Sequence, residues 1–248
     1  MSVDRYILSL SDNSMILAHR LSELCGHGPT LETDIALTNI SLDLFGQVRG
    51  FLSVLAARQG GEVTEDSLAF LRGEREHLNC ILTELPNTDF AHIIVRQYFF
   101  DVFHKLQLEL LIDSKDEDIS AIATKSLKEA KYHERFSHSW MLRLGDGTEV
   151  SNKKMQVAVN ALYPYVHELF DLTDWEKELI KKGVAVDTDQ IKEEYHKKIN
   201  ETLMQANLTI EGLSNRYAKG KHGMHTENLG FILSEFQYMQ RAYPQMQW

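Results

Sequence analysis

Proline is scarce in this chain of 248 residues. There are four prolines, where average usage would give about twelve. They leave three long proline-free runs, 30–85, 87–163 and 165–243. Because proline ends helices and is common in the turns of β-rich and α/β proteins, its scarcity argues against those classes and favours long helices.

Cysteine and positive charge are also scarce. The two cysteines, Cys25 and Cys80, lie in apolar helical surroundings, so we expect reduced, buried thiols rather than a disulfide framework. Asp and Glu number 36 against 26 Lys and Arg, which gives a net charge of −10. Contacts with nucleic-acid phosphates need a basic surface, so no nucleic-acid partner is expected.

The sequence shows neither a secretory signal nor a long uncharged apolar run. An early acidic residue, Asp4, interrupts the N-terminal segment, which has no apolar core. No stretch of 18 residues is free of charged and polar groups. We therefore predict a cytoplasmic protein without a membrane-spanning helix.

Apolar residues recur at helical spacing along most of the chain, and no convincing strand is found. Capping residues, glycines and prolines divide the chain into predicted helices over 4–25, 30–59, 64–85, 89–113, 116–144, 150–170, 173–183, 187–206 and 225–243. The helix 30–59 is apolar nearly all round, which predicts a central position. Long helices joined by short turns, with no linker-like change in composition, predict one all-α helical-bundle domain over residues 1–248.

Polar and small residues recur at spacings of three and four on the long helices, which places them on one face of each. A buried polar stripe must be hydrogen-bonded, so we expect Asp101 and His133 to lie in the core and to bond neighbouring polar groups. The predicted stripes are Ala36, Asn39, Asp43, Gly46, Gln47 and Gly50; Gln97, Asp101 and His104; and Glu129, His133 and Ser137.

Facing polar stripes are also where helical bundles hold two iron ions. Such sites use one Glu from each of two helices and a Glu-x-x-His pair from each of the other two. On the central helices the corresponding positions hold Leu44 with Gln47 and Ala130 with His133, which cannot replace about four carboxylates. The acid-x-x-His pairs present in the chain are Glu74 and His77, Glu193 and His196, Asp89 and His92, and Asp101 and His104. The two Glu pairs lie in dense charge runs typical of solvated faces.

Several long motifs of the chain resemble one known family. They are CGHGPTLETDIALTNISLDLFGQVRGFL, RQYFFDVFH, KEAKYHERFSHSWMLRLGDG and GKHGMHTENLGFILSEFQYMQR with a final Trp. These motifs are similar to the C subunits of bacterial phenylacetyl-CoA 1,2-epoxidase, and the resemblance covers essentially the whole chain. It implies a ferritin-like helical bundle with additional C-terminal helices. It also implies a structural role in a multicomponent di-iron monooxygenase of aerobic phenylacetate degradation.

The resemblance further implies how cofactors and partners are distributed. In that family the catalytic A subunit holds the two irons, the C subunit pairs with it, and a separate reductase uses NADPH. We therefore expect no catalytic residue, no metal and no cofactor in this chain, and an A subunit as its partner; the isolated chain could also form a homodimer. The family's ligand motif falls on Leu44, Gln47, Ala130 and His133. With Asp43 and Asp101, these become positions of a vestigial site.

Two other functions remain open from the residues. One is a self-sufficient di-metal oxygenase with a non-standard site built from Asp43, Asp101, His104, Glu129 and His133. The other is a helical binding module unrelated to oxygenases.

Two groups near the C-terminal end are candidate contacts. The basic residues Arg216, Lys219, Lys221 and His222 form either a solvated loop or a contact for an acidic partner surface or for the phosphates of coenzyme A. The aromatic residues Phe231, Phe236, Tyr238 and Trp248 are candidate anchors of a subunit interface or part of the chain's own core.

Overall fold

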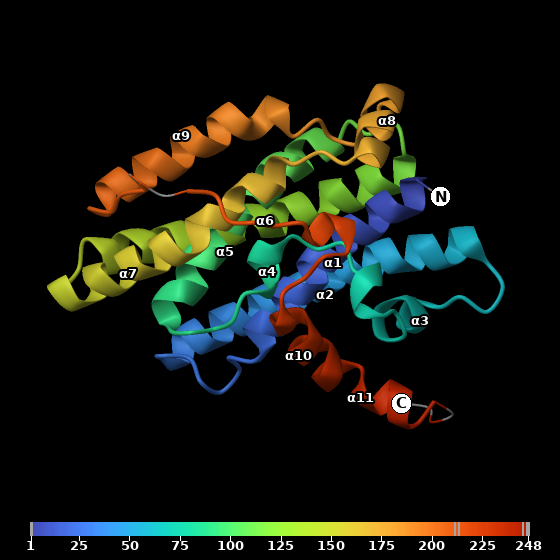
Figure 1. The fold of residues 1–248 in the computed structure, drawn as a ribbon, viewed down its shortest axis with the longest axis horizontal. Coiled ribbons are helices and arrows are strands. Elements are labelled where there is room, and N and C mark those ends of the chain that lie inside the picture. The colour runs from blue at the N-terminus through green and yellow to red at the C-terminus, as the bar shows by residue number, and fades with distance from the viewer. Residues whose placement is uncertain (1, 211, 213, 245, 247–248) are drawn as a thin grey trace. The chain divides into compact units, whose positions relative to one another are not determined.

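The computed structural model describes residues 2–210, 212, 214–244 and 246 (Figure 1). These residues form eleven α-helices and three short 3₁₀ helices. Within them there is no strand, and one isolated β-bridge joins Lys219 and Met224. The predicted all-α class is confirmed.

The chain divides into two compact units, and each is described by itself. Unit 1 comprises Met1–Pro86 and Ala218–Trp248, and unit 2 comprises Asn87–Tyr217. Each unit is built around a pair of long helices, α1 and α2 in the first and α5 and α6 in the second. The single domain expected over residues 1–248 stays a prediction.

Unit 1 begins with the hairpin of α1 (Ser2–Ser22) and α2 (Leu31–Gln59). The hydroxyl of Thr30 accepts from the backbone N–H of Thr33 and starts α2 at the predicted residue. The two helices lie side by side (Figure 1). Where they meet, the Ser41 hydroxyl donates to the Ala18 carbonyl at 2.8 Å and lies 2.9 Å from the Ser22 hydroxyl. Small hydroxyl side chains let the helices approach closely there.

The helix predicted over 64–85 is broken, and the prediction is wrong on this point. Side chains from α1 meet the backbone of the segment instead. The Asp12 carboxylate accepts from the N–H of Leu78, and the Asn13 side-chain oxygen accepts from the N–H of Cys80, both at 2.8 Å. These bonds satisfy backbone groups that a continuous helix would pair internally. The segment therefore has three short pieces, α3 (Glu65–Phe70), a 3₁₀ turn (Glu74–Glu76) and α4 (Ile81–Glu84).

The C-terminal segment completes unit 1 with a 3₁₀ turn (Gly220–His222), α10 (Glu227–Phe236) and α11 (Tyr238–Ala242). A side chain at Gly220 would collide with the carbonyl oxygen of Asn79, so the backbone there lies directly on the preceding segment. The helix predicted over 225–243 is interrupted at Gln237. The side chain of Gln237 donates to the Arg72 carbonyl at 2.9 Å.

Unit 2 is centred on α5 (Phe90–Leu111), which packs against α6, α7 and α9. Asp89 and Asp116 cap α5 and α6 at or near the predicted starts. The helix predicted over 150–170 changes from α-helix to 3₁₀ helix at Tyr163, directly before Pro164. The remaining elements are α6 (Glu117–Gly145), α7 (Glu149–Leu162), a 3₁₀ helix (Tyr163–Phe170), α8 (Asp174–Lys182) and α9 (Asp189–Gln205).

Among the described helices, α2 alone is long and apolar enough to cross a membrane, with an 18-residue window of mean hydropathy 1.3. This test uses length and composition only. About 44% of the window is buried inside the structure, and core helices of soluble proteins pass the same test. The finding is a weak indication of a membrane span.

A buried ion pair holds the broken segment against α1. Both carboxylate oxygens of Asp12 accept from the Arg72 guanidinium, and the Asp12 side chain is fully buried. We expect Asp12→Ala to lower the free energy of unfolding by roughly 3–5 kcal/mol, because Arg72 then stays buried without its counter-charge. Urea denaturation followed by circular dichroism measures this loss. The double variant Asp12→Leu/Arg72→Met removes both charges and should recover most of it; equal stability of Asp12→Ala and the native chain would contradict the prediction.

Candidate functional site

A buried hydrogen-bonded network joins the middles of α5 and α6. Asp101 is 2% exposed, and its two carboxylate oxygens accept from Gln97 Nε2 and from the Ser137 hydroxyl, each at 2.7 Å. Gln97 lies one turn before Asp101 on α5, whereas Ser137 belongs to α6. His133, one turn before Ser137, is fully buried. The predicted burial of Asp101 and His133, and the predicted hydrogen bonding of Asp101, are confirmed.

Burial dominates the electrostatics of this network. It raises the pKa of Asp101 to about 6, although the charge of His133 and the hydrogen bonds from Ser137 and Gln97 lower it. Burial likewise lowers the pKa of His104 to about 3, and the charge of His133 adds to the effect. His104 is therefore neutral at pH 7, and its ring stacks on Phe100 with centroids 5.2 Å apart.

The predicted stripe on α2 does not form one buried face. Leu44 and Gln47 are buried, Asp43 is half-buried, and Asn39 and Gly46 are exposed. The sequence of α2 does not show which side of the helix faces the core, because a helix that is apolar nearly all round has no distinct inner face. The prediction of a continuous internal stripe on α2 is wrong.

The residues present do not fit a carboxylate-bridged di-iron site. Leu44 and Ala130 have no side-chain donor atom, and the two oxygens of Asp101 already accept hydrogen bonds from the protein. Within the described part of the chain, no group of three His, Cys, Asp or Glu side chains could hold a metal ion. The alternative di-metal site named above includes His104 and Glu129. In unit 2, His104 is buried and Glu129 is only half-buried.

Histidines of two of the acid-x-x-His pairs contact groups of the protein itself. Asp89 caps α5 by accepting from the N–H of His92, and its carboxylate lies 2.7 Å from His92 Nδ1. His77 is buried, with Nδ1 3.0 Å from the Gly73 carbonyl. Burial lowers the pKa of His77.

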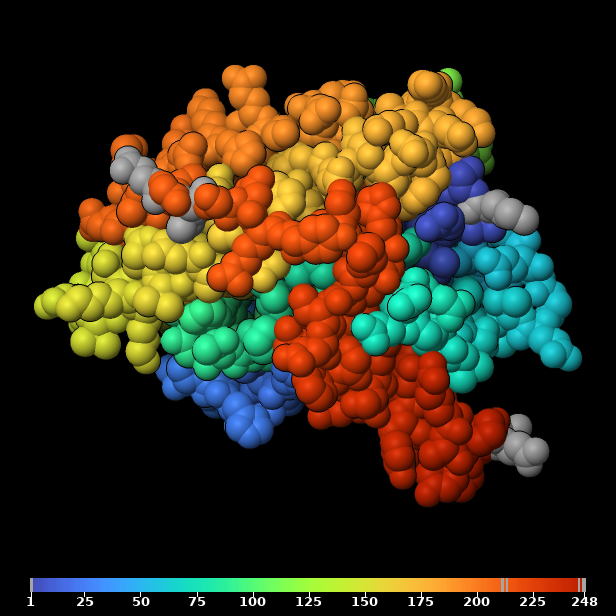
Figure 2. All heavy atoms as spheres, in the orientation of Figure 1, coloured from blue at the N-terminus to red at the C-terminus, as the bar shows by residue number. Residues whose placement is uncertain are grey.

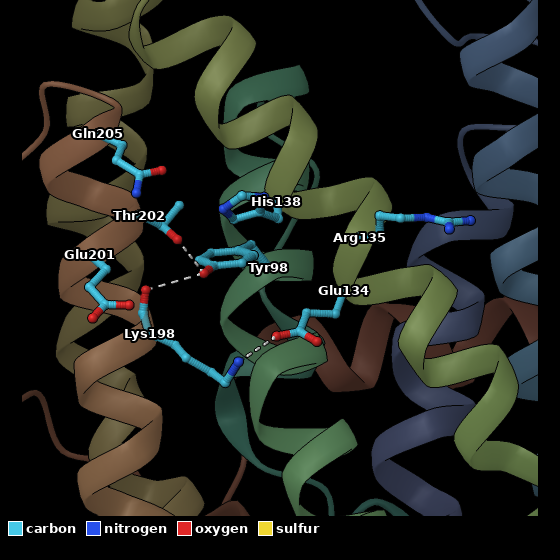
Figure 3. Close-up of a pocket in the computed structure, with 8 residues that line it drawn as sticks. All are labelled: Tyr98, Glu134, Arg135, His138, Lys198, Glu201, Thr202 and Gln205. Atoms are coloured by element: carbon cyan, nitrogen blue, oxygen red, sulfur yellow. Dashed lines mark hydrogen bonds and ion pairs between the residues drawn. The ribbon is translucent and has the colours of Figure 1, made fainter.

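A polar pocket of about 310 Å³ lies between α5, α6 and α9 (Figure 3). On one side Glu134 pairs with Lys198 at 3.7 Å and with Lys105 at 2.8 Å. On the other, the Tyr98 hydroxyl lies 2.7 Å from the Thr202 hydroxyl. These groups form ion pairs and hydrogen bonds with one another, so the pocket is a polar contact region between the helices. Sequence reasoning missed it because its residues come from three helices and lie more than a hundred positions apart in the chain.

The basic cluster does not form a uniformly exposed patch. Arg216 and His222 are exposed, Lys219 is half-buried, and Lys221 is only 6% exposed. Arg216 also belongs to unit 2, whereas the other three belong to unit 1. Lys221 is poorly placed to reach a phosphate. Contact with coenzyme A or an acidic partner stays a prediction.

Another buried carboxylate, Glu84, anchors the C-terminal segment and was not predicted. It accepts from the Thr226 N–H at 2.7 Å, the Thr226 hydroxyl at 2.9 Å and the Asn79 side chain at 3.0 Å. His225 Nδ1 lies 2.8 Å from the Glu84 carboxylate, and its Nε2 lies 2.9 Å from the His77 carbonyl. Both ring nitrogens of His225 therefore face oxygen atoms of unit 1, and the ring links the Glu84 carboxylate to the segment that holds His77.

The predicted aromatic anchors divide into two kinds. Phe236 stacks on His19 with centroids 4.2 Å apart and meets the edge of Phe70, so it packs within unit 1. Phe231 and Tyr238 are 63% and 58% exposed on α10 and α11, whose side chains form the dark red surface in Figure 2. Trp248 lies outside the described residues. Phe231 and Tyr238 remain the candidate interface anchors.

Comparison with known proteins defines the class. The chain belongs to the phenylacetic acid catabolic protein family, whose sequence profile matches residues 2–248. The ferritin-like helical fold and the family resemblance predicted from the sequence are thereby confirmed. One relative is the C subunit of the 1,2-phenylacetyl-CoA epoxidase of Escherichia coli K12. It is 46% identical over 243 residues, covering 98% of each chain.

The raised pKa of Asp101 makes stability depend on pH. Between about pH 4 and pH 6 the folded chain keeps a proton on Asp101 that the unfolded chain releases, so the contribution of this group is lost as pH rises through its folded pKa. Relative to Asp101→Asn, the native chain should lose up to about 3 kcal/mol between pH 4 and pH 7.5. Urea denaturation at several pH values measures this difference. Asp118→Asn, at an exposed position of α6, is the matched control, and a difference that stays constant with pH would refute the prediction.

Removing the ring of His225 should loosen the C-terminal segment. In His225→Leu the buried Glu84 carboxylate and the His77 carbonyl each lose a hydrogen-bond partner, and a buried polar group left without its partner is destabilising. We expect faster amide exchange over 218–242 than in the native chain, measured by hydrogen–deuterium exchange mass spectrometry. His222→Leu, which changes an exposed histidine of the same segment, should leave the exchange unchanged. Native protection in His225→Leu would show that Glu84 does not anchor the segment.

Proposed function

We propose that this chain is a structural, non-catalytic subunit of a phenylacetyl-CoA epoxidase complex of aerobic phenylacetate degradation. The relative named as the C subunit of this epoxidase matches the chain over 98% of both lengths. Because the match covers nearly the whole of both chains, it supports the same subunit role for this chain, and not only a shared domain. We place the chain in the cytoplasm, with a di-iron A subunit as its partner.

The main support for this proposal is the shortage of side chains that could bind iron. Oxygen activation at two irons needs several carboxylates that can bridge and bind the metals. Here Leu44 and Ala130 stand at positions of the ligand motif, and Asp101 is engaged with Gln97 and Ser137. The iron chemistry then belongs to the partner, and NADPH is used by a separate reductase.

The side chains of α5 and α6 suit a supporting role. The bond between Asp101 and Ser137 ties the two helices together by protein groups alone. Such a pair needs no metal to reach its final geometry, so it can present a fixed surface to a partner. A partner that holds metal ligands to sub-ångström tolerance benefits from rigid support.

Reconstitution tests the role. We expect the chain with reductase, NADPH and phenylacetyl-CoA to form no product, and the catalytic subunit to turn over at least tenfold more slowly when this chain is omitted. Product analysis by liquid chromatography and iron content per chain are the measurements. Equal turnover without this chain would refute the structural role. Product formed without the catalytic subunit, together with two irons per chain, would instead establish the self-sufficient oxygenase.

A further inference from the structure

One side of α6 is basic, although the chain as a whole is acidic. Over 121–145, all of which the structure describes, every exposed charged residue is a cation. Glu129 and Glu134, the acids of this stretch, are half-buried. The exposed cations are Lys125, Lys128, Lys131, Arg135 and Arg143. This side of α6 therefore has the opposite sign to the whole chain, whose net charge is −10.

Most of these cations share one face of the helix. Lys125, Lys128, Arg135 and Arg143 follow each other at spacings close to whole helical turns, and Tyr132 lies among them. We call these five residues the basic face of α6. At 1.5 Å per residue the face is roughly 27 Å long. It is an extended surface, which one binding group of a small molecule could not cover.

The positive charges of this side are available to a partner. None of its three exposed lysines makes an ion pair with a residue that the structure describes. The Arg135 guanidinium lies over the Tyr132 ring, 5.6 Å from its centroid, and the Arg143 guanidinium lies 5.5 Å from the centroid of Trp140. Such contacts orient a guanidinium and leave its N–H donors free to bind carboxylates. Figure 3 shows the Arg135 side chain extending away from α9.

The form and charge of this face narrow the class of occupant. Small anions are bound by polar groups that converge in a pocket, whereas these cations are spread along an exposed helix. Nucleic acid is disfavoured because the net charge of −10 repels it. Permanent subunit interfaces are strongly apolar, and lysine is depleted in interfaces. An acidic protein surface that binds reversibly fits all three observations.

We propose that the basic face of α6 is a docking surface for an acidic surface of another protein, which binds reversibly. Exposed charges of one sign attract a partner of the opposite sign and raise its association rate. Tyr132, which is 38% exposed, supplies aromatic contact area within the face. This inference does not depend on the proposed role in an epoxidase.

Binding of fluorescein-labelled poly-L-glutamate, measured by fluorescence anisotropy, is the first test. Lys125→Glu/Lys128→Glu should bind at least tenfold more weakly than the native chain, whereas Lys125→Arg/Lys128→Arg should bind as the native chain does. Lys181→Glu/Lys182→Glu makes the same change of charge at exposed lysines of α8 and should keep native affinity. Absence of binding to the native chain, or equal losses in the two glutamate variants, would overturn the proposal.

Competition distinguishes carboxylates from phosphates. We expect neither a DNA duplex nor coenzyme A to displace poly-L-glutamate from the native chain at equal concentrations of negative charge. Displacement by either would show that the face binds phosphate groups, and the assignment to an acidic protein surface would be wrong. Added salt should weaken the binding of poly-L-glutamate to the native chain, because exposed charges are screened; binding that is insensitive to salt would also contradict the proposal.

The reconstituted epoxidase reaction tests the face with protein partners. Lys125→Glu/Lys128→Glu should raise the half-saturating concentration of one protein component at least tenfold, with no change in that of phenylacetyl-CoA or in the rate at saturation. The same result for Lys181→Glu/Lys182→Glu, or a change for phenylacetyl-CoA alone, would refute the proposal. If the reaction is equally fast without this chain, the proposed function fails, and the poly-L-glutamate measurement decides about the face.

Discussion

A buried carboxylate must be met by donors, because an ionised group removed from water costs several kcal/mol unless it is paired. Three buried carboxylates of this chain meet the requirement with protein groups alone. Asp12 uses Arg72 and a backbone N–H, Glu84 uses His225, Thr226 and Asn79, and Asp101 uses Gln97 and Ser137. In a ferritin-like bundle that binds iron, interior carboxylates are metal ligands. Here they serve as fixed points between segments.

These fixed points also explain which parts of the fold the sequence could predict. The starts of α2, α5 and α6 depend on Thr30, Asp89 and Asp116, which cap backbone groups three residues away. Such signals are local and can be read directly. The break within 64–85 depends on Asp12 and Asn13, more than sixty positions earlier. No local sequence pattern can predict hydrogen bonds to side chains that are so far away in the chain.

In the candidate site, too, local features can be predicted from the sequence and long-range contacts cannot. Asp101 and His133 lie on polar stripes in the middle of long helices, so the sequence predicts their burial. The pairing of Glu84 with His225 joins residues 141 positions apart and has no sequence signature. Burial of Lys221 is likewise set by tertiary packing, so basic residues that are close in the sequence are not all exposed on the surface.

The two sides of α2 differ in their surroundings. On the inner side, Leu44 and Gln47 are buried and need no metal to reach their final arrangement. Protein groups alone therefore hold this side of the helix in place. Association of rigid surfaces costs less ordering entropy than association of surfaces that must first reorganise. A helix fixed from within by apolar packing therefore exposes Ile35 and Leu42 on a surface that need not reorganise before another protein covers it.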